Sequence, residues 1–223
     1  MRPKSLKKIQ KPKVMDRRTA LKNLSIGLGY TVASPTIFNM LSSCTAEASG
    51  WTPLFLSVDE KHMVTHLTDI ILPKTNTPGA LDVNVPQFLD LMYADIEKKQ
   101  NQDIFKKGAL IFGEAFKTKF DIEVVEGNKA QYETLLGSYF KISETTEQAL
   151  LKLQRQPLES ISKTDMGNYL LYNFLLSVRR YTLFGYYTSE KVGETILNYD
   201  PIPGEQKGCI PLEDVPNSNA WSL

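Results

Sequence analysis

Two histidines, His62 and His66, stand four residues apart in the sequence, and Asp69 follows three residues after the second. On an α-helix this spacing places the side chains beside one another on one face, where imidazole and carboxylate groups could bind a metal ion. A metal centre would need further ligands from elsewhere, and no glutamate separates the histidines as in the zinc-protease pattern HExxH. The alternative interpretation is that both histidines lie on the flank of a structural helix.

Other motifs that carry chemistry are absent from the sequence. It has no glycine-rich GxGxxG turn for a nucleotide, no CxxCH for covalent haem and no CxxC metal knuckle. Neither serine nor cysteine shows the local signature of a catalytic nucleophile. We therefore predict no catalytic, cofactor-binding or metal site in this chain. The alternative is a stand-alone exported lipoprotein with a metal or binding site around His62, His66 and Asp69.

Hydrophobic residues recur at helical spacing between residues 57 and 197, whereas strand-type alternation never extends beyond four or five residues. The expected helices cover residues 57–72, 86–98, 103–120, 132–140, 143–154 and 164–185, with a short one after Ser189. The sequence thus predicts a single all-α domain of about six to seven helices, residues 57–197. A linker, residues 44–56, precedes it, and an extended proline-rich tail, residues 198–223, follows it.

Local patterns add detail to these helices. Ser57 and Glu60 have the spacing of a capping box, and Pro73 ends the helix that they begin. In the third helix, Leu110 belongs to a set of apolar residues that we expect to face mostly inward. The run of residues 169–176 is apolar nearly all round, which is typical of a central buried helix.

The first 43 residues have the features of an export signal rather than of a folded domain. Arg17 and Arg18 precede a weakly apolar run from Leu24 to Met40, and paired arginines indicate the twin-arginine route, which exports folded proteins. The run ends in LSSC, which resembles a bacterial lipobox. We therefore expect a lipid on Cys44 and a location on the periplasmic face of a bacterial membrane. The alternative is an uncleaved anchor of about 17 residues, the low end of a membrane span.

The charges divide at the same point. Removing the nine basic residues and one acidic residue of positions 1–43 from totals of 26 and 25 leaves 17 basic and 24 acidic residues. The body after the signal therefore carries a net charge of about −7. This charge argues against nucleic acid as a partner, because such binding relies on cationic contacts to phosphate.

Cys44 and Cys209 are the only cysteines. If Cys44 is acylated, no intramolecular disulfide can form and Cys209 is a lone thiol in an oxidising compartment. We expect this thiol to be buried and inert, because free cysteine behaves as a small hydrophobe. The alternative is an intermolecular bond or burial at an interface.

Four blocks of the sequence carry a resemblance to a known family: ILPKTNTPGA at 71–80, YTLFGYYTSE at 181–190, YDPIPG at 199–204 and GCIP at 208–211. Together with the twin-arginine leader they resemble the gluconate 2-dehydrogenase subunit 3 family, the small subunit of membrane-bound, flavin-dependent sugar dehydrogenases. The resemblance covers most of residues 51–223. The lipobox is a departure from the commonest family pattern.

The resemblance implies a large flavoprotein partner of the glucose-methanol-choline type, which holds FAD, while the small subunit holds no cofactor. In such complexes a cytochrome c subunit with haem c often takes the electrons. The small subunit typically carries the export signal and takes the folded, flavin-loaded partner through the membrane. The resemblance leaves open the sugar, the electron acceptor and the presence of a cytochrome.

Aromatic residues near the end of the most apolar helix and in the tail are the predicted partner surface. Tyrosine and tryptophan favour interfaces because they combine an apolar body with a polar tip, and a proline-rich tail loses less entropy on docking. The residues concerned are Phe184, Tyr186, Tyr187, Tyr199, Pro201 and Trp221. The alternative is that the three helix-end aromatics cap this domain's own core and that the tail wraps its own helices.

Overall fold

The computed structural model describes residues 51–200, 202, 204–205 and 209–222. The chain divides into two compact units, residues 1–50 and 51–223, of which the second is described here. Arg17, Arg18, Cys44 and Pro201 lie outside the described residues, so the export signal and the lipid anchor stay predictions.

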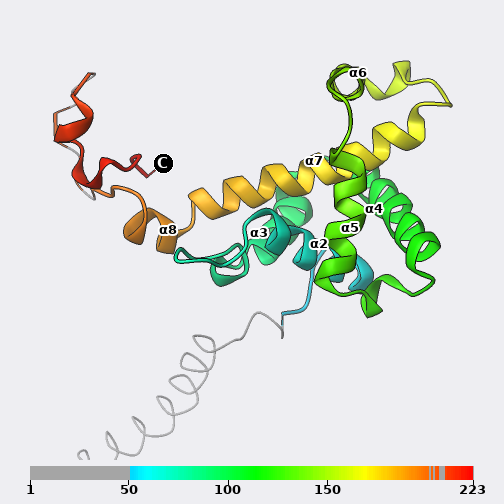
Figure 1. Ribbon diagram of the computed structural model, residues 1–223, viewed down its shortest axis with the longest axis horizontal. Helices are drawn as coiled ribbons and strands as arrows, with labels where there is room; N and C mark the ends of the chain where they lie inside the picture. Colours follow the sequence, from blue (N-terminus) through cyan, green and yellow to red (C-terminus); the bar gives the residue numbers. More distant parts are fainter. Residues whose placement is uncertain (1–50, 201, 203, 206–208, 223) are drawn as a thin grey trace, which may run out of the picture. The chain divides into compact units, whose positions relative to one another are not determined.

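Seven α-helices make up most of the described part, which contains no strand, and the prediction of an all-α fold is confirmed (Figure 1). The helices are α2 (Val58–Ile71), α3 (Val85–Leu91), α4 (Lys99–Phe120), α5 (Lys129–Phe140), α6 (Glu144–Gln154), α7 (Met166–Tyr187) and α8 (Glu190–Thr195). Shorter turns are η2 (Leu81–Val83), the π-helical η3 (Met92–Ile96), η4 (Val124–Glu126), η5 (Leu158–Ser160), η6 (Leu212–Asp214) and η7 (Pro216–Ser218).

Capping residues set where the helices begin. The predicted capping box of α2 is confirmed: the Ser57 hydroxyl accepts from the Glu60 N–H, and the Glu60 carboxylate accepts from the Ser57 N–H. Asn128 and Gln131 form the equivalent box at α5. Asp121 ends α4 with a left-handed backbone, φ 56°.

Helix α7 is the centre of the bundle, as its apolar sequence predicts. It packs against α2, α3, α4 and α6 (Figure 1). Its crossing with α4 is close because Gly108 has no side chain: a Cβ there would lie 2.3 Å from the Leu170 carbonyl oxygen. Around this crossing, Phe105, Phe112 and Phe174 are fully buried in the main hydrophobic cluster.

One predicted core position is wrong. Leu110, expected to face inward on α4, has 63% of its surface exposed. Its neighbours Ala109 and Phe112 are fully buried, so the face of α4 that meets α7 excludes Leu110. The helical spacing is correct, but the apolar stripe in the sequence is wider than the buried face.

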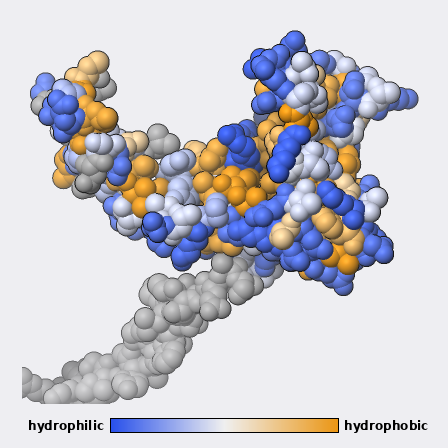
Figure 2. All heavy atoms as spheres, viewed as in Figure 1, coloured by the Kyte–Doolittle hydropathy of each residue, from blue (hydrophilic) through white to orange (hydrophobic). Residues whose placement is uncertain are grey.

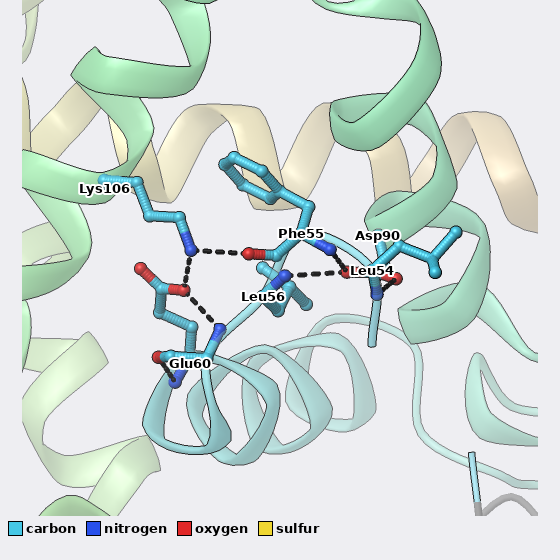
Figure 3. Close-up of polar contacts among 7 residues, drawn as sticks. Leu54, Phe55, Leu56, Glu60, Asp90 and Lys106 are labelled. Carbon is cyan, nitrogen blue, oxygen red and sulfur yellow. Dashed lines mark hydrogen bonds and ion pairs between the residues drawn. The ribbon is translucent and has the colours of Figure 1, made fainter. Parts of the chain in front are cut away.

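The segment that enters the bundle is held by one buried carboxylate. Asp90 on α3 is 2% exposed, and its two oxygens accept three backbone hydrogen bonds (Figure 3). The N–H groups of Leu54 and Leu56 donate at 2.8 Å and that of Phe55 at 3.0 Å. Residues 51–56, part of the predicted linker, therefore pack with the helical unit.

A second polar contact fixes the same segment. Lys106 on α4 donates to the Phe55 carbonyl oxygen at 2.6 Å and forms an ion pair with the buried Glu60 (Figure 3). The Lys106 ammonium also lies 4.2 Å from the centre of the Phe55 ring. Residues of α2, α3 and α4 thus all help to hold the segment 54–56, which lies just before α2.

Within the described residues, no helix combines the length and the hydrophobicity that crossing a membrane requires.

Candidate partner interface

The two histidines do lie on one face of α2, but Asp69 has another partner. The imidazole rings of His62 and His66 meet edge to face with centroids 4.6 Å apart. The Asp69 carboxylate is paired with Lys129 of α5 at 2.6 Å. No group of three or more metal-ligating side chains occurs in the part of the chain that the structure describes. The geometry is that of a helix flank packed against α5.

Both histidines contact other residues of the helical bundle. His62 Nε2 lies 3.1 Å from the Gly127 carbonyl oxygen, and His66 stacks on the buried ring of Tyr132 at 4.8 Å. Burial lowers the pKa of His66 below its usual value; the charge of His62 also lowers it, with a smaller contribution from Lys129, while Asp69 opposes the change. The surroundings of His66 therefore favour the neutral form of its ring, which stacks on Tyr132.

The end of α7 is a tightly packed aromatic corner. A Cβ on Gly185 would lie 2.5 Å from the Phe88 ring, so only glycine allows α3 and α7 to meet there. Phe88 also contacts Phe184 and Tyr181, with ring centroids 5.7 and 6.4 Å apart. The corner fixes the direction in which the last turn of α7 presents its side chains.

Of the three predicted aromatics in this corner, Tyr186 belongs to the chain's own core. It is 6% exposed, and its hydroxyl donates to the Pro78 carbonyl oxygen at 2.9 Å. With Ala80, Val85 and Val192 it forms a small second cluster that joins the 73–80 loop to α8. For Tyr186, the alternative of capping the chain's own core describes the observed packing.

Phe184 and Tyr187 face outward. They stand three residues apart on one side of α7 and are 48% and 44% exposed. The Tyr187 ring packs edge to face against the buried Tyr186 ring, with the centroids 5.4 Å apart. The exposed ring of Tyr187 is therefore supported by a buried side chain. Two large, firmly supported aromatic side chains at a helix end are suited to anchor a partner.

The C-terminal segment closes on itself near α8. Asn198 exchanges two backbone hydrogen bonds with the end of the chain: its N–H donates to Ala220 and its carbonyl accepts from Ser222, each at 2.8 Å. Its side-chain amide donates to the Asn219 carbonyl at 2.6 Å, and the Asn219 amide donates to Ile196. We call residues 199–222 the C-terminal arm, and this closure its neck.

The arm exposes large hydrophobic residues that no described part of the chain covers. Figure 2 shows hydrophobic side chains at the left of the view, where the arm lies, among hydrophilic neighbours. The exposed large hydrophobic residues of the arm are Tyr199, Ile202, Ile210, Leu212 and Trp221. The expectation of a buried Cys209 is wrong: its thiol is free and exposed, because the arm has no core of its own to enclose it.

Of the residues predicted for a partner surface, four are exposed, whereas Ile202, Ile210 and Leu212 were not predicted, and neither were the contacts that support this region. The aromatic residues were visible as types, whereas the neck formed by Asn198 and Asn219 and the tether from Tyr186 to Pro78 join residues 21 to 108 positions apart. No short-range pattern marks such pairs. The one available signal was the pair of asparagines flanking a proline-rich stretch.

Comparison with curated proteins and with solved structures finds no match. A family model, described as gluconate 2-dehydrogenase subunit 3, matches residues 58–204. The match begins with the first residue of α2 and extends into the C-terminal arm. Residues 58–204 are more than half of the chain. The chain belongs to the gluconate 2-dehydrogenase subunit 3 family.

Proposed function

We propose that this chain is the non-catalytic small subunit of a membrane-associated, flavin-dependent sugar dehydrogenase complex. It supplies the export signal for a large flavoprotein of the glucose-methanol-choline type, then anchors and stabilises that subunit. FAD belongs to the large subunit, and haem c to a cytochrome c subunit where one is present. The family name, which describes a subunit of gluconate 2-dehydrogenase, supports this proposal.

The observation that carries the proposal is the apolar surface that the chain leaves open. Phe184 and Tyr187 project from the end of α7, and the arm adds five further exposed hydrophobic residues. Large apolar side chains are more stable out of water, and exposed apolar surface on a protein often marks an interaction site. A large protein partner accounts for this surface.

The leader supports the export role. Arg17 and Arg18 precede the only signal-like segment, and the twin-arginine route carries folded cargo. A flavoprotein that binds FAD in the cytoplasm needs such a route. One leader on the small subunit then serves two chains, and the lipid on Cys44 holds the complex at the periplasmic face of the membrane.

Purification through this chain in mild detergent tests the proposal. We expect a larger, flavin-containing chain to co-purify, and we expect Arg17→Lys with Arg18→Lys to leave both chains in the cytoplasm. Labelling with a fatty-acid analogue should mark the wild-type chain and not Cys44→Ser. Metal-dependent activity of the isolated chain, with no flavoprotein bound, would instead favour the site around His62 and His66, which no observation described above favours.

A further inference from the structure

An apolar groove lies between α2, α5 and α7, away from the aromatic corner and the arm. Its volume is about 460 Å³, within the range of small-molecule pockets. The lining is mostly aliphatic and aromatic: Leu67, Ile70, Ile71, Leu136, Gly137, Phe140, Leu175 and Val178. In Figure 2 hydrophobic side chains gather along the middle of α7 on the face shown, bordered by hydrophilic ones.

The rim of the groove carries three charged residues, Glu133, Lys141 and Arg179. All three are exposed, and none takes part in an ion pair among the described residues. Lys141 is placed over the wall: a Cβ on Gly137 would lie 3.7 Å from its Cε. The rim therefore has a net positive charge beside an apolar floor.

We propose that this groove binds a long-chain fatty acid, with the acyl chain on the apolar floor and the carboxylate at the rim that carries Lys141 and Arg179. The floor is apolar and well supported, because Leu67, Leu175 and Val178 are almost fully buried beneath it. An acyl chain gains stability with each methylene that leaves water, roughly 0.8 kcal/mol for each one buried. The two cations supply charge-assisted partners for the head.

The lining favours an acyl chain over a peptide segment. A bound extended peptide brings backbone N–H and C=O groups that need partners, and an apolar floor offers none. The only charged or polar side chains lining the groove are the three at its rim. One groove of this volume suits a single chain with one charged end, which a fatty acid provides and a diacyl lipid does not.

Gly137 allows a matched pair of variants. An added Cβ would meet only the flexible end of Lys141, at ordinary contact distances of 3.7–4.0 Å, so Gly137→Ala should keep the groove open. Gly137→Trp places a large ring in the wall and fills the groove. A second pair of changes, Lys141→Gln with Arg179→Gln, removes the cations at exposed positions and should leave the fold intact.

The test uses the full chain carrying Cys44→Ser, which removes the attached lipid, and a fluorescent palmitate analogue as the probe. Unlabelled palmitate should displace the probe, and hexadecanol, the neutral analogue, should displace it less well. Gly137→Trp should abolish probe binding, whereas Gly137→Ala should bind within about twofold of the parent chain. The double glutamine variant should weaken palmitate by roughly tenfold and hexadecanol hardly at all.

Equal binding of the probe to Gly137→Trp and to the parent chain would overturn the proposal. So would equal competition by palmitate and hexadecanol that the double glutamine variant leaves unchanged. Suppose that neither the parent chain nor any variant binds the probe, and that Gly137→Trp fails to co-purify a flavoprotein that the parent retains. The groove is then a protein-docking site. That result would remove the fatty acid and leave the small-subunit function standing.

Discussion

The Tyr186 hydroxyl donates a hydrogen bond to the Pro78 carbonyl oxygen at 2.9 Å across 108 positions of sequence. This bond joins the 73–80 loop to the last turn of α7, the turn that also carries the exposed residues Phe184 and Tyr187. The loop and the aromatic corner are therefore one structural unit, although they lie in different blocks of the sequence. Any partner that binds the corner meets a surface that is already ordered.

Tyr186→Phe should lower the free energy of unfolding by about 1 kcal/mol, because the ring stays buried while the hydroxyl leaves an unpaired carbonyl behind. Urea denaturation of the two proteins measures the difference. Tyr187→Phe is the matched control, since that side chain is nearly half exposed and should change the midpoint little. Equal stability of Tyr186→Phe and the wild type would show that the bond contributes nothing.

Asp90→Asn should be more costly than the Tyr186 change. The carboxylate accepts from three backbone N–H groups, and a neutral amide offers only one oxygen to them. Each buried donor left unpaired costs about 1–3 kcal/mol, and proteolysis should then release the segment before α2. Asp95→Asn, at an exposed position on η3, is the control and should behave as wild type.

Gly108→Ala should destabilise the bundle strongly, and Gly167→Ala should not. A Cβ at 108 would overlap the Leu170 carbonyl oxygen, so α4 and α7 would have to separate. Such overpacking typically costs about 1–3 kcal/mol. A Cβ at 167, in the first turn of α7, would meet nothing within 4 Å beyond its chain neighbours and the backbone of its own helix. Gly167→Ala should therefore raise the free energy of unfolding by about 0.5–1 kcal/mol. Thermal unfolding followed by circular dichroism separates the two.

The helices could be predicted from the sequence because their signals are local. Ser57 and Glu60 are three residues apart, and the capping box that they form depends on nothing further along the chain. The role of Asp90 could not be predicted, since its sequence context resembles any polar position on a helix and its donors lie 34–36 residues away. The prediction of a buried Cys209 was wrong because it relied on the general tendency of free cysteine to be buried. That tendency does not take into account whether a hydrophobic core lies near the residue.

Acidification should weaken the fold through His66. Its pKa is lowered in the folded chain by burial, so below about pH 6.5 the unfolded chain binds more protons than the folded one. The free energy of unfolding should therefore decrease as the pH falls from 6.5 to the folded-state pKa, and then level off. Urea titrations at several pH values should show this slope in the wild type and a shallower one in His66→Gln. An unchanged slope would assign the effect to another group.

Cys209 is a built-in reporter of the arm. Its exposed thiol should react quickly with a maleimide in the isolated chain and should be protected when the proposed flavoprotein partner is bound. Removing residues 219–223 deletes the partners of Asn198 in the neck and should reduce co-purification of the proposed partner while helix content persists. The measurement uses the Cys44→Ser background, in which Cys209→Ser removes the last thiol and is the unlabelled control. A thiol that reacts equally fast in the complex would show that this part of the arm stays in solvent.

The clamp on residues 54–56 also determines how mechanical tension enters the protein. A pull on the chain from the N-terminal side of residue 51 loads Trp51, whose carbonyl oxygen accepts from Lys61 of α2 at 2.6 Å. It then loads the segment 54–56, whose three backbone N–H groups all donate to Asp90, so three hydrogen bonds to one carboxylate resist its displacement. Because Asp90 belongs to α3, which packs on α7, the load spreads into the centre of the bundle. Under the proposed lipid anchoring, the drag on a bound partner would therefore be taken up by the packed helices rather than by a loop.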